Sequence, residues 1–277
     1  MSLRFPRIRR ATRTDQVALL GYIDGLQMSQ VFTDLDHDIE LSPGQACLTN
    51  SIGEAVMVSY SGSIEKGIDA TWTAGSGGGK SSLGATGIDE WLDVFLMSDR
   101  RGTQVDIGFE EIGTGPSTLV SDSGLEFTRR IGSVFTDGSA NVIPFIQKGD
   151  MFYWDTPRLD VEETPSGTNT LITKVLSVPT GVNVHAQVEV QYDSGAATKF
   201  YLHPPFVADI NAGSLGSTPV EMPYTAGRSG GNEPVSTVMF IMTDTSGQVS
   251  YTATNNPADG VGIMTLGWID PRGRRWA

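Results

Sequence analysis

The sequence predicts an all-β protein made of antiparallel β-sandwich or jelly-roll-like units, with an extended N-terminal arm. Three observations favour this fold class. The 277-residue chain contains 33 glycines and 14 prolines but only 18% charged residues, a composition that suits strands joined by tight turns. Asp/Gly turn signals recur between β-rich runs, and several of these runs alternate apolar and polar residues with period two.

The N-terminal arm is predicted over residues 1–15, and its charge differs from that of the body. The first 13 residues contain five arginines and no acidic residue, so a chain with a net charge of −13 carries −18 on the remainder. Further arginines gather at the C-terminus. An acidic body with basic ends suggests ends that dock onto an acidic partner, although two solvated tails are the alternative. The expected assembly anchors are Arg4, Phe5, Arg7, Ile8, Arg9, Arg10, Arg13, Arg272, Arg274, Arg275 and Trp276.

Two β-rich domains are predicted after the arm, over residues 16–155 and 156–277, with the polar segment 161–169 as the boundary. Each contains two turns in which Asp comes first and Gly closes the turn, a pattern that favours type I turns and therefore hairpins. The four turn segments are 99–102, 137–138, 193–195 and 244–247.

Side-chain alternation indicates sheets with one solvent-exposed face and one buried face. In 182–190, valines and Ala186 alternate with polar residues such as His185, which is expected on the wet face. Segment 91–97 is predicted as a strand, although the apolar spacing from Ile88 to Phe95 also fits a helix.

Several function classes are disfavoured by composition. Cys47 is the only cysteine, so neither an internal disulfide nor a thiolate metal cage is available. No apolar run approaches the roughly 18 residues of a membrane helix, and the N-terminus does not read as a signal peptide. The strongly acidic body argues against nucleic-acid binding. We therefore expect no membrane insertion and no nucleic-acid partner.

Motifs that resemble chemical sites are incomplete. Segment 74–81 reads AGSGGGKS, close to a phosphate-binding loop, but the glycines that follow are poor helix formers, so an exposed flexible loop is expected. Asp34, Asp36 and Asp38 alternate as in a calcium loop, yet Ile39 stands where that loop needs glycine. The histidines are scattered, and adjacent glutamates such as Glu110-Glu111 point to opposite faces of a strand. The sequence thus predicts no enzyme, and no catalytic, cofactor or metal residues.

Tryptophans are candidates for sugar stacking. Trp91, Trp154 and Trp268 sit in apolar runs typical of a core. Trp72, beside the glycine-rich segment, is the candidate for glycan contact.

Three stretches resemble a widespread group of bacteriophage and prophage virion structural proteins, of tail, fibre or head-appendage type. They are residues 72–78 with 91–96, residues 129–145 with 149–154, and residues 265–274. The central run RRIGSVFTDGSANVIPF is the most distinctive. The resemblance implies a particle component and brings no activity or catalytic residue with it.

The functional prediction is an oligomeric appendage of the virion, a tail fibre or spike or a head fibre or decoration, docked through its N-terminal arm. Its expected partners are other virion proteins, further copies of itself with a trimer favoured, and a host surface polysaccharide. The alternatives are a stand-alone carbohydrate-binding module and a glycan hydrolase for host attachment. Head or tail location, symmetry and receptor stay open.

Overall fold

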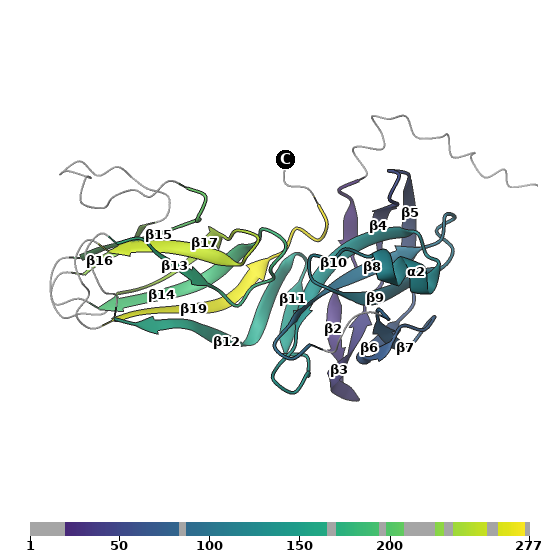
Figure 1. Cartoon of the computed structure of the whole chain (residues 1–277), viewed down its shortest axis with the longest axis horizontal. Helices are drawn as coiled ribbons and strands as arrows, with labels where there is room; N and C mark the ends of the chain where they lie inside the picture. Colours follow the sequence, from purple (N-terminus) through teal and green to yellow (C-terminus); the bar gives the residue numbers. More distant parts are fainter. Residues whose placement is uncertain are drawn as a thin grey trace, which may run out of the picture.

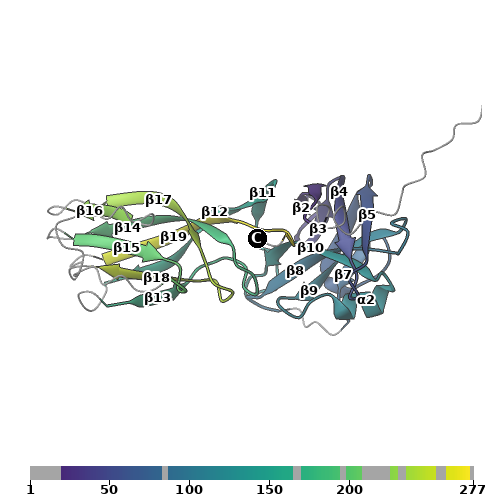
Figure 2. The same cartoon turned by 90° about the horizontal axis from the view of Figure 1, so that it is seen from above.

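The prediction of an all-β fold is confirmed. The computed structural model describes residues 20–82, 87–164, 170–193, 198–207, 225–229, 235–253 and 260–274, and the predicted arm over 1–15 lies outside them. Within these ranges the chain forms strands and one short helix, α2 (Ser117–Ser123). Figures 1 and 2 show an elongated body with a curved sheet at one end and a two-sheet sandwich at the other.

The first half of the chain forms a ten-stranded N-terminal sheet. Its hydrogen-bonded order is β1-β4-β10-β8-β9-β7-β6-β3-β2, and β5 pairs with β4. Most pairs are antiparallel, but β7 runs parallel to both β6 and β9, which makes this sheet mixed. Its strands are β1 (Ile23–Gly25), β2 (Met28–Val31), β3 (Asp34–Leu41), β4 (Gly44–Thr49), β5 (Ala55–Tyr60), β6 (Ile64–Thr71), β7 (Gly77–Lys80), β8 (Trp91–Ser98), β9 (Val105–Glu111) and β10 (Phe127–Phe135).

Strand β8 shows why the N-terminal sheet lacks regular polar alternation. All eight of its residues are buried. Leu92, Val94 and Leu96 face the main core, whereas Phe95 and Met97 pack with Leu119 of α2 on the opposite side. Because both faces are covered, apolar residues occupy both, and the strand reads as a continuous apolar run. The prediction of a strand over 91–97 is confirmed.

The second half forms the C-terminal sandwich. A five-stranded sheet has the order β11-β12-β19-β14-β17, and a four-stranded sheet has the order β13-β18-β15-β16. Tyr192 of the first sheet stacks on Phe200 of the second, with ring centroids 5.6 Å apart. The strands are β11 (Phe145–Lys148), β12 (Met151–Glu163), β13 (Ile172–Val175), β14 (His185–Asp193), β15 (Thr198–His203), β16 (Thr225–Ser229), β17 (Val235–Met242), β18 (Gln248–Ala253) and β19 (Gly260–Ile269).

The four predicted turns divide into hairpins and corners. Segment 99–102 joins the antiparallel pair β8 and β9, and 137–138 lies inside the bridge that pairs Thr136 with Val142. Segment 244–247 is also a tight turn, in which Asp244 accepts bonds from two backbone amides. However, the strands around 193–195 and around 244–247 pair in different sheets. The hairpin prediction is wrong for these two segments, because a local turn signal does not say which sheet the next strand joins.

The strands of the two units separate earlier than the predicted boundary at 155/156. The N-terminal sheet ends with β10 at Phe135, and β11 from Phe145 already belongs to the sandwich. Strand β12 crosses position 155 and runs into the polar segment 161–169. Strand pairing, which composition does not reveal, therefore sets the division.

Candidate functional site

The junction between the two units contains a buried ion-pair network. Arg130 of β10 donates from Nε to Asp93 of β8 at 2.6 Å, and its Nη1 and Nη2 donate to both oxygens of Asp270 at 2.7 and 2.9 Å. Ser133 Oγ receives a bond from Arg130 and donates to Asp93. Burial lowers the pKa of Arg130, but the two carboxylates outweigh burial and raise it above its usual value. The two parallel hydrogen bonds from the Arg130 guanidinium to the Asp270 carboxylate fix the end of β19 on the N-terminal sheet.

A second arginine closes the junction from the C-terminal side. Arg272 is 2% exposed, and its guanidinium donates to the carbonyls of Ile131 at 3.0 Å and Gly25 at 3.1 Å, and to that of Leu26. Burial lowers its pKa to about 10. Arg272 was predicted as a docking anchor, but all of these contacts are made within its own chain. Its burial gives it a structural role, because the donors that would bind a partner are already used.

Aromatic side chains fill the space beside these ion pairs. Trp268 stacks on Phe152 with centroids 5.2 Å apart and meets Trp91 edge-on at 5.4 Å. Trp154 lies 5.1 Å from Trp268 and donates its indole N–H to Ser177 O at 2.9 Å. The core positions predicted for Trp91, Trp154 and Trp268 are confirmed. Such a cluster resists bending between the units, since any movement would expose large rings to water.

The first and last described residues meet at this junction. Arg129 donates to the carbonyls of Leu20 and Gly21, and Arg274 Nε donates to Gly21 O at 3.2 Å. Arg274 also pairs with Asp150 and is partly exposed. The chain therefore enters and leaves the described body at one place. The other predicted anchors lie outside the described residues: Arg4, Phe5, Arg7, Ile8, Arg9, Arg10, Arg13, Arg275 and Trp276.

Trp72 has partners on its own body. Its indole N–H donates to Ile107 O at 3.0 Å, its ring packs against the small core around α2, and Lys66 Nζ lies 4.8 Å from the ring centroid. These contacts pack part of a half-buried Trp72, and the glycan contact stays a prediction.

Half of the phosphate-loop-like segment is a strand, and only residues 74–76 form an exposed bend. Residues 77–80 form β7, whereas a phosphate loop requires a turn that opens a helix. The glycines allow close packing, because a Cβ on Gly79 would lie 2.6 Å from the Phe109 ring and one on Gly78 2.1 Å from Thr71 O. Among the described residues, no group of three or more His, Cys, Asp or Glu side chains is placed to hold a metal ion.

The outer face of the five-stranded sheet exposes apolar side chains. Cross-strand partners share a face, and one row runs from Ile146 through Tyr153, Gly267 and Gln187 to Phe240. Ile146 is 46% exposed and Phe240 47% exposed, whereas Phe145, Gln147 and Ile241 on the opposite face are buried. Exposed apolar groups on an ordered sheet are typical of contact surfaces.

The described ranges contain no helix with the length and apolarity that crossing a bilayer requires.

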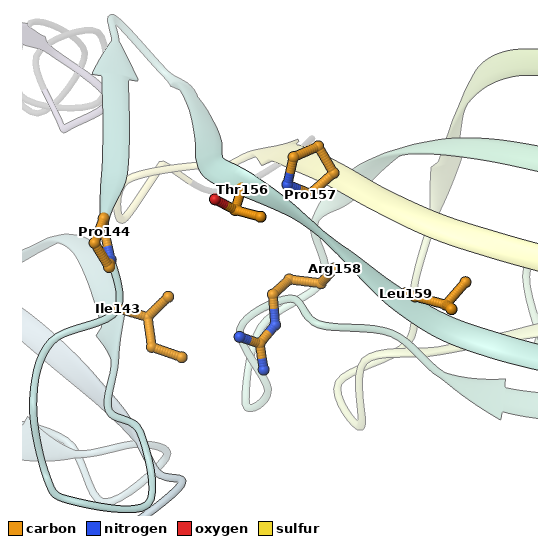
Figure 3. Close-up of a pocket in the computed structure, with 6 residues that line it drawn as sticks. All are labelled: Ile143, Pro144, Thr156, Pro157, Arg158 and Leu159. Carbon is orange, nitrogen blue, oxygen red and sulfur yellow. The ribbon is translucent and has the colours of Figure 1, made fainter.

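A groove of about 300 Å³ lies where β12 bends near the junction (Figure 3). The segment before β11 contributes Ile143 and Pro144, and the remaining lining comes from β12. Arg158 extends from β12 toward Ile143, and its guanidinium carbon lies 5.9 Å from the Trp154 ring centroid. The β12 residues that line the groove are Thr156, Pro157, Arg158 and Leu159.

The charged residues of the junction were missed as functional candidates, although the sequence carried a signal for them. Asp93 is a single charge within the apolar run 91–97, a pattern typical of a buried, paired carboxylate, whereas Arg130 follows Arg129 and Asp270 ends an apolar run. Each of these residues lies in one of the three stretches named in the sequence analysis: Asp93 in 91–96, Arg130 in 129–145 and Asp270 in 265–274. The sequence could not show that positions so far apart would meet.

Comparison with known proteins gives little further information. No protein-family model matches the chain, and no curated protein matches it. Among solved structures, the chain is similar to a Bacillus thuringiensis Cry1Da tryptic core variant, with 10% sequence identity and a TM-score of 0.18. The match covers 87% of this chain and 50% of the other, so this chain spans about half the length of that structure. A TM-score this low carries no argument about fold or function.

Proposed function

We propose that this chain is a structural subunit of a bacteriophage-type particle, an oligomeric appendage that docks through its basic N-terminal arm. The observation that carries the proposal is the meeting of Leu20, Gly21 and Arg274 at the locked junction. Both ends of the described body lie at one place, so the basic segment before residue 14 is joined to the body at Leu20, beside Arg274. A single basic docking point on an acidic, rigid body suits attachment to one acidic site on a larger assembly.

The rigid junction supports the same function. An appendage transmits force between its attachment point and its far end, so its units must not hinge. Arg130 links the two units through a buried bidentate ion pair, and the aromatic cluster packs beside it. The exposed side chains of Ile146, Tyr153 and Phe240 on the outer face of the five-stranded sheet support contact between copies of this chain.

The test is particle incorporation of a chain lacking residues 2–13. This variant should melt at the same temperature as the full chain and keep its oligomeric state in sedimentation, because the described body begins at Leu20. Incorporation into particles should be lost. A length-matched control replaces Arg4, Arg7, Arg9, Arg10 and Arg13 with glutamine, and it should also fail to join particles.

Two outcomes would contradict the proposal. Normal incorporation of the truncated chain would remove the docking role of the arm. A full-length chain that sediments as a monomer would remove the oligomeric part.

A further inference from the structure

The groove at the bend of β12 presents an arginine that has no acidic partner among the described residues. Arg158 is partly buried, and its guanidinium carbon lies 5.9 Å from the centroid of the Trp154 ring. The nearby Asp160 carboxylate is already used, because it accepts bonds from Ser177 Oγ at 2.5 Å and from the Thr265 hydroxyl. The chain elsewhere pairs its buried arginines with carboxylates or carbonyls, as Arg130 and Arg272 show. An unpaired, partly desolvated guanidinium fixed over an aromatic ring is prepared to bind an anion.

The bend exists because β12 and β19 lose register there. Tyr153 opposes Gly267 and Arg158 opposes Thr265, so four residues of β12 lie opposite a single residue of β19. The backbone turns toward the segment before β11, and Asp155 N donates to Pro144 O at 3.1 Å. Pro157, inside this bulge, has no N–H to donate to a ladder. One wall of the groove is therefore set by the strand pairing of β12 and β19, and the segment before β11 supplies the other wall with Ile143 and Pro144.

The lining indicates the chemistry of the ligand. Apart from Arg158, the groove offers the hydroxyl of Thr156 and the apolar surfaces of Ile143, Pro144, Pro157 and Leu159. One planar guanidinium matches one carboxylate in a two-bond pair. A guanidinium also pairs with phosphate, but the single positive charge in this lining balances a singly charged carboxylate and only part of a doubly charged phosphate monoester. A volume of about 300 Å³ is at the small end for ligand pockets and suits one sugar-sized residue.

We propose that this groove binds a carboxylate-bearing sugar residue, of the uronic or sialic acid type, within a surface polysaccharide. Arg158 pairs with the sugar carboxylate, Thr156 contacts a sugar hydroxyl, and the proline and aliphatic walls cover the C–H faces of the ring. The proposal deepens the proposed function by naming a receptor class for the appendage, and it rests on that function. Each groove binds weakly, and several copies in one assembly supply avidity.

The test measures binding by the full chain of two probes, an oligogalacturonate and a sialyllactose, each beside its carboxyl-reduced counterpart. Chemical-shift perturbation or calorimetry should give a dissociation constant of about 1 mM for at least one acidic probe. Arg158→Gln should weaken that binding by about tenfold or more, and carboxyl reduction should do the same. The matched control is Arg100→Gln, an exposed arginine of the N-terminal sheet paired with Glu54, and it should change nothing.

The remaining outcomes overturn the inference. Arg158 is not the binding group if Arg158→Gln binds as tightly as the original chain, or if the carboxyl-reduced sugars bind as tightly as the acidic ones. The site does not bind acidic sugars if neither acidic probe binds at a concentration 10-fold above the expected dissociation constant. It is not specific for sugars if an oligoglutamate peptide binds as tightly as the acidic probes. Particle incorporation of Arg158→Gln separates this inference from the proposed function. A variant that joins particles normally while failing to bind sugar supports both. If the original chain joins no particles, the structural role fails whatever the sugar result.

Discussion

The N-terminal sheet and the C-terminal sandwich are both built from strands, but they fill their interiors differently. In the sandwich, strand β14 alternates buried valines with polar residues, and rings such as Phe200 and Tyr251 stack 5.1 Å apart in its core. In the N-terminal sheet, β8 is buried on both faces, and charged side chains lie within the interior. Lys66 is fully buried there and pairs with Asp106 at 3.2 Å. The interior of the curved sheet, which is covered on both sides, therefore includes buried ion pairs. The interior of the sandwich is filled by the apolar side chains of strands that alternate apolar and polar residues.

The largest expected effect comes from breaking the buried pair of the N-terminal sheet. Lys66→Met leaves the Asp106 carboxylate without its cation, and burial already raises the pKa of Asp106. We expect a loss of about 3 kcal/mol in the free energy of unfolding, measured by guanidinium denaturation. The double variant Lys66→Met/Asp106→Leu should recover most of that loss, since it leaves no buried charge unpaired.

The matched control lies in the sandwich. Lys174 pairs with Glu163, and both side chains are 29% exposed. Lys174→Met should therefore cost less than about 1 kcal/mol. Equal losses for Lys66→Met and Lys174→Met would show that the two regions do not differ in the way described here.

A smaller effect is expected from overpacking the sandwich where β12 and β19 approach. A Cβ on Gly267 would lie 2.1 Å from Phe152 O and 2.9 Å from Tyr153 Cα, both backbone atoms held in the ladder. Gly267→Ala should destabilise the fold by about 2 kcal/mol in thermal or denaturant unfolding. Gly138→Ala, whose nearest atom would be 3.9 Å away, should stay within about 0.5 kcal/mol. A neutral Gly267→Ala would mean that the two strands can separate without loss.

The smallest effect concerns the half-buried Asp38 of β3 and the acidic residues around it in the N-terminal sheet. Burial, and then Asp34 and Asp69, raise the pKa of Asp38 above the usual 3.8. The folded state therefore favours the protonated form, and this contribution to stability is present below pH 3.8 and lost as the pH rises. Asp38→Asn should stabilise the protein at pH 7 by no more than about 0.5 kcal/mol, because solvent screens the repulsion.

Two conditions sharpen this last measurement. In urea denaturation at pH 3 the gain should vanish, because Asp38 is then protonated in both states, and at 1 M salt it should shrink. A gain of the same size at pH 3 and pH 7 would show that the ionised carboxylate of Asp38 is not its cause.

Much of the local structure could be predicted from particular residues. The aspartates of the turns at 99–102 and 244–247 specify tight turns, and the valines of 182–190 specify a strand with one buried face. The partners of the strands could not be predicted, because a tight turn serves equally well in a hairpin and at a corner between two sheets. The helix α2 also escaped prediction: its N-cap residue, Pro116, provides no side-chain bond. The Glu110 carboxylate of β9 accepts the Leu119 N–H at 3.2 Å instead, and Leu119 packs against Phe95 and Met97.

By itself, the sequence determined the all-β character, the tryptophan core and the separation of charge between the ends and the body. These features follow from local periodicity, turn chemistry and composition, which act over a few residues. The tertiary structure alone decided that Arg130, Asp93 and Asp270 meet, that Arg272 is buried, and that Arg158 has no acidic partner within the part of the chain that the structure describes. Such contacts join residues up to 247 positions apart, as between Arg272 and Gly25, and depend on strand order and register. Local patterns carry no information on that order, because the same strand can pair with several others at similar local free energy.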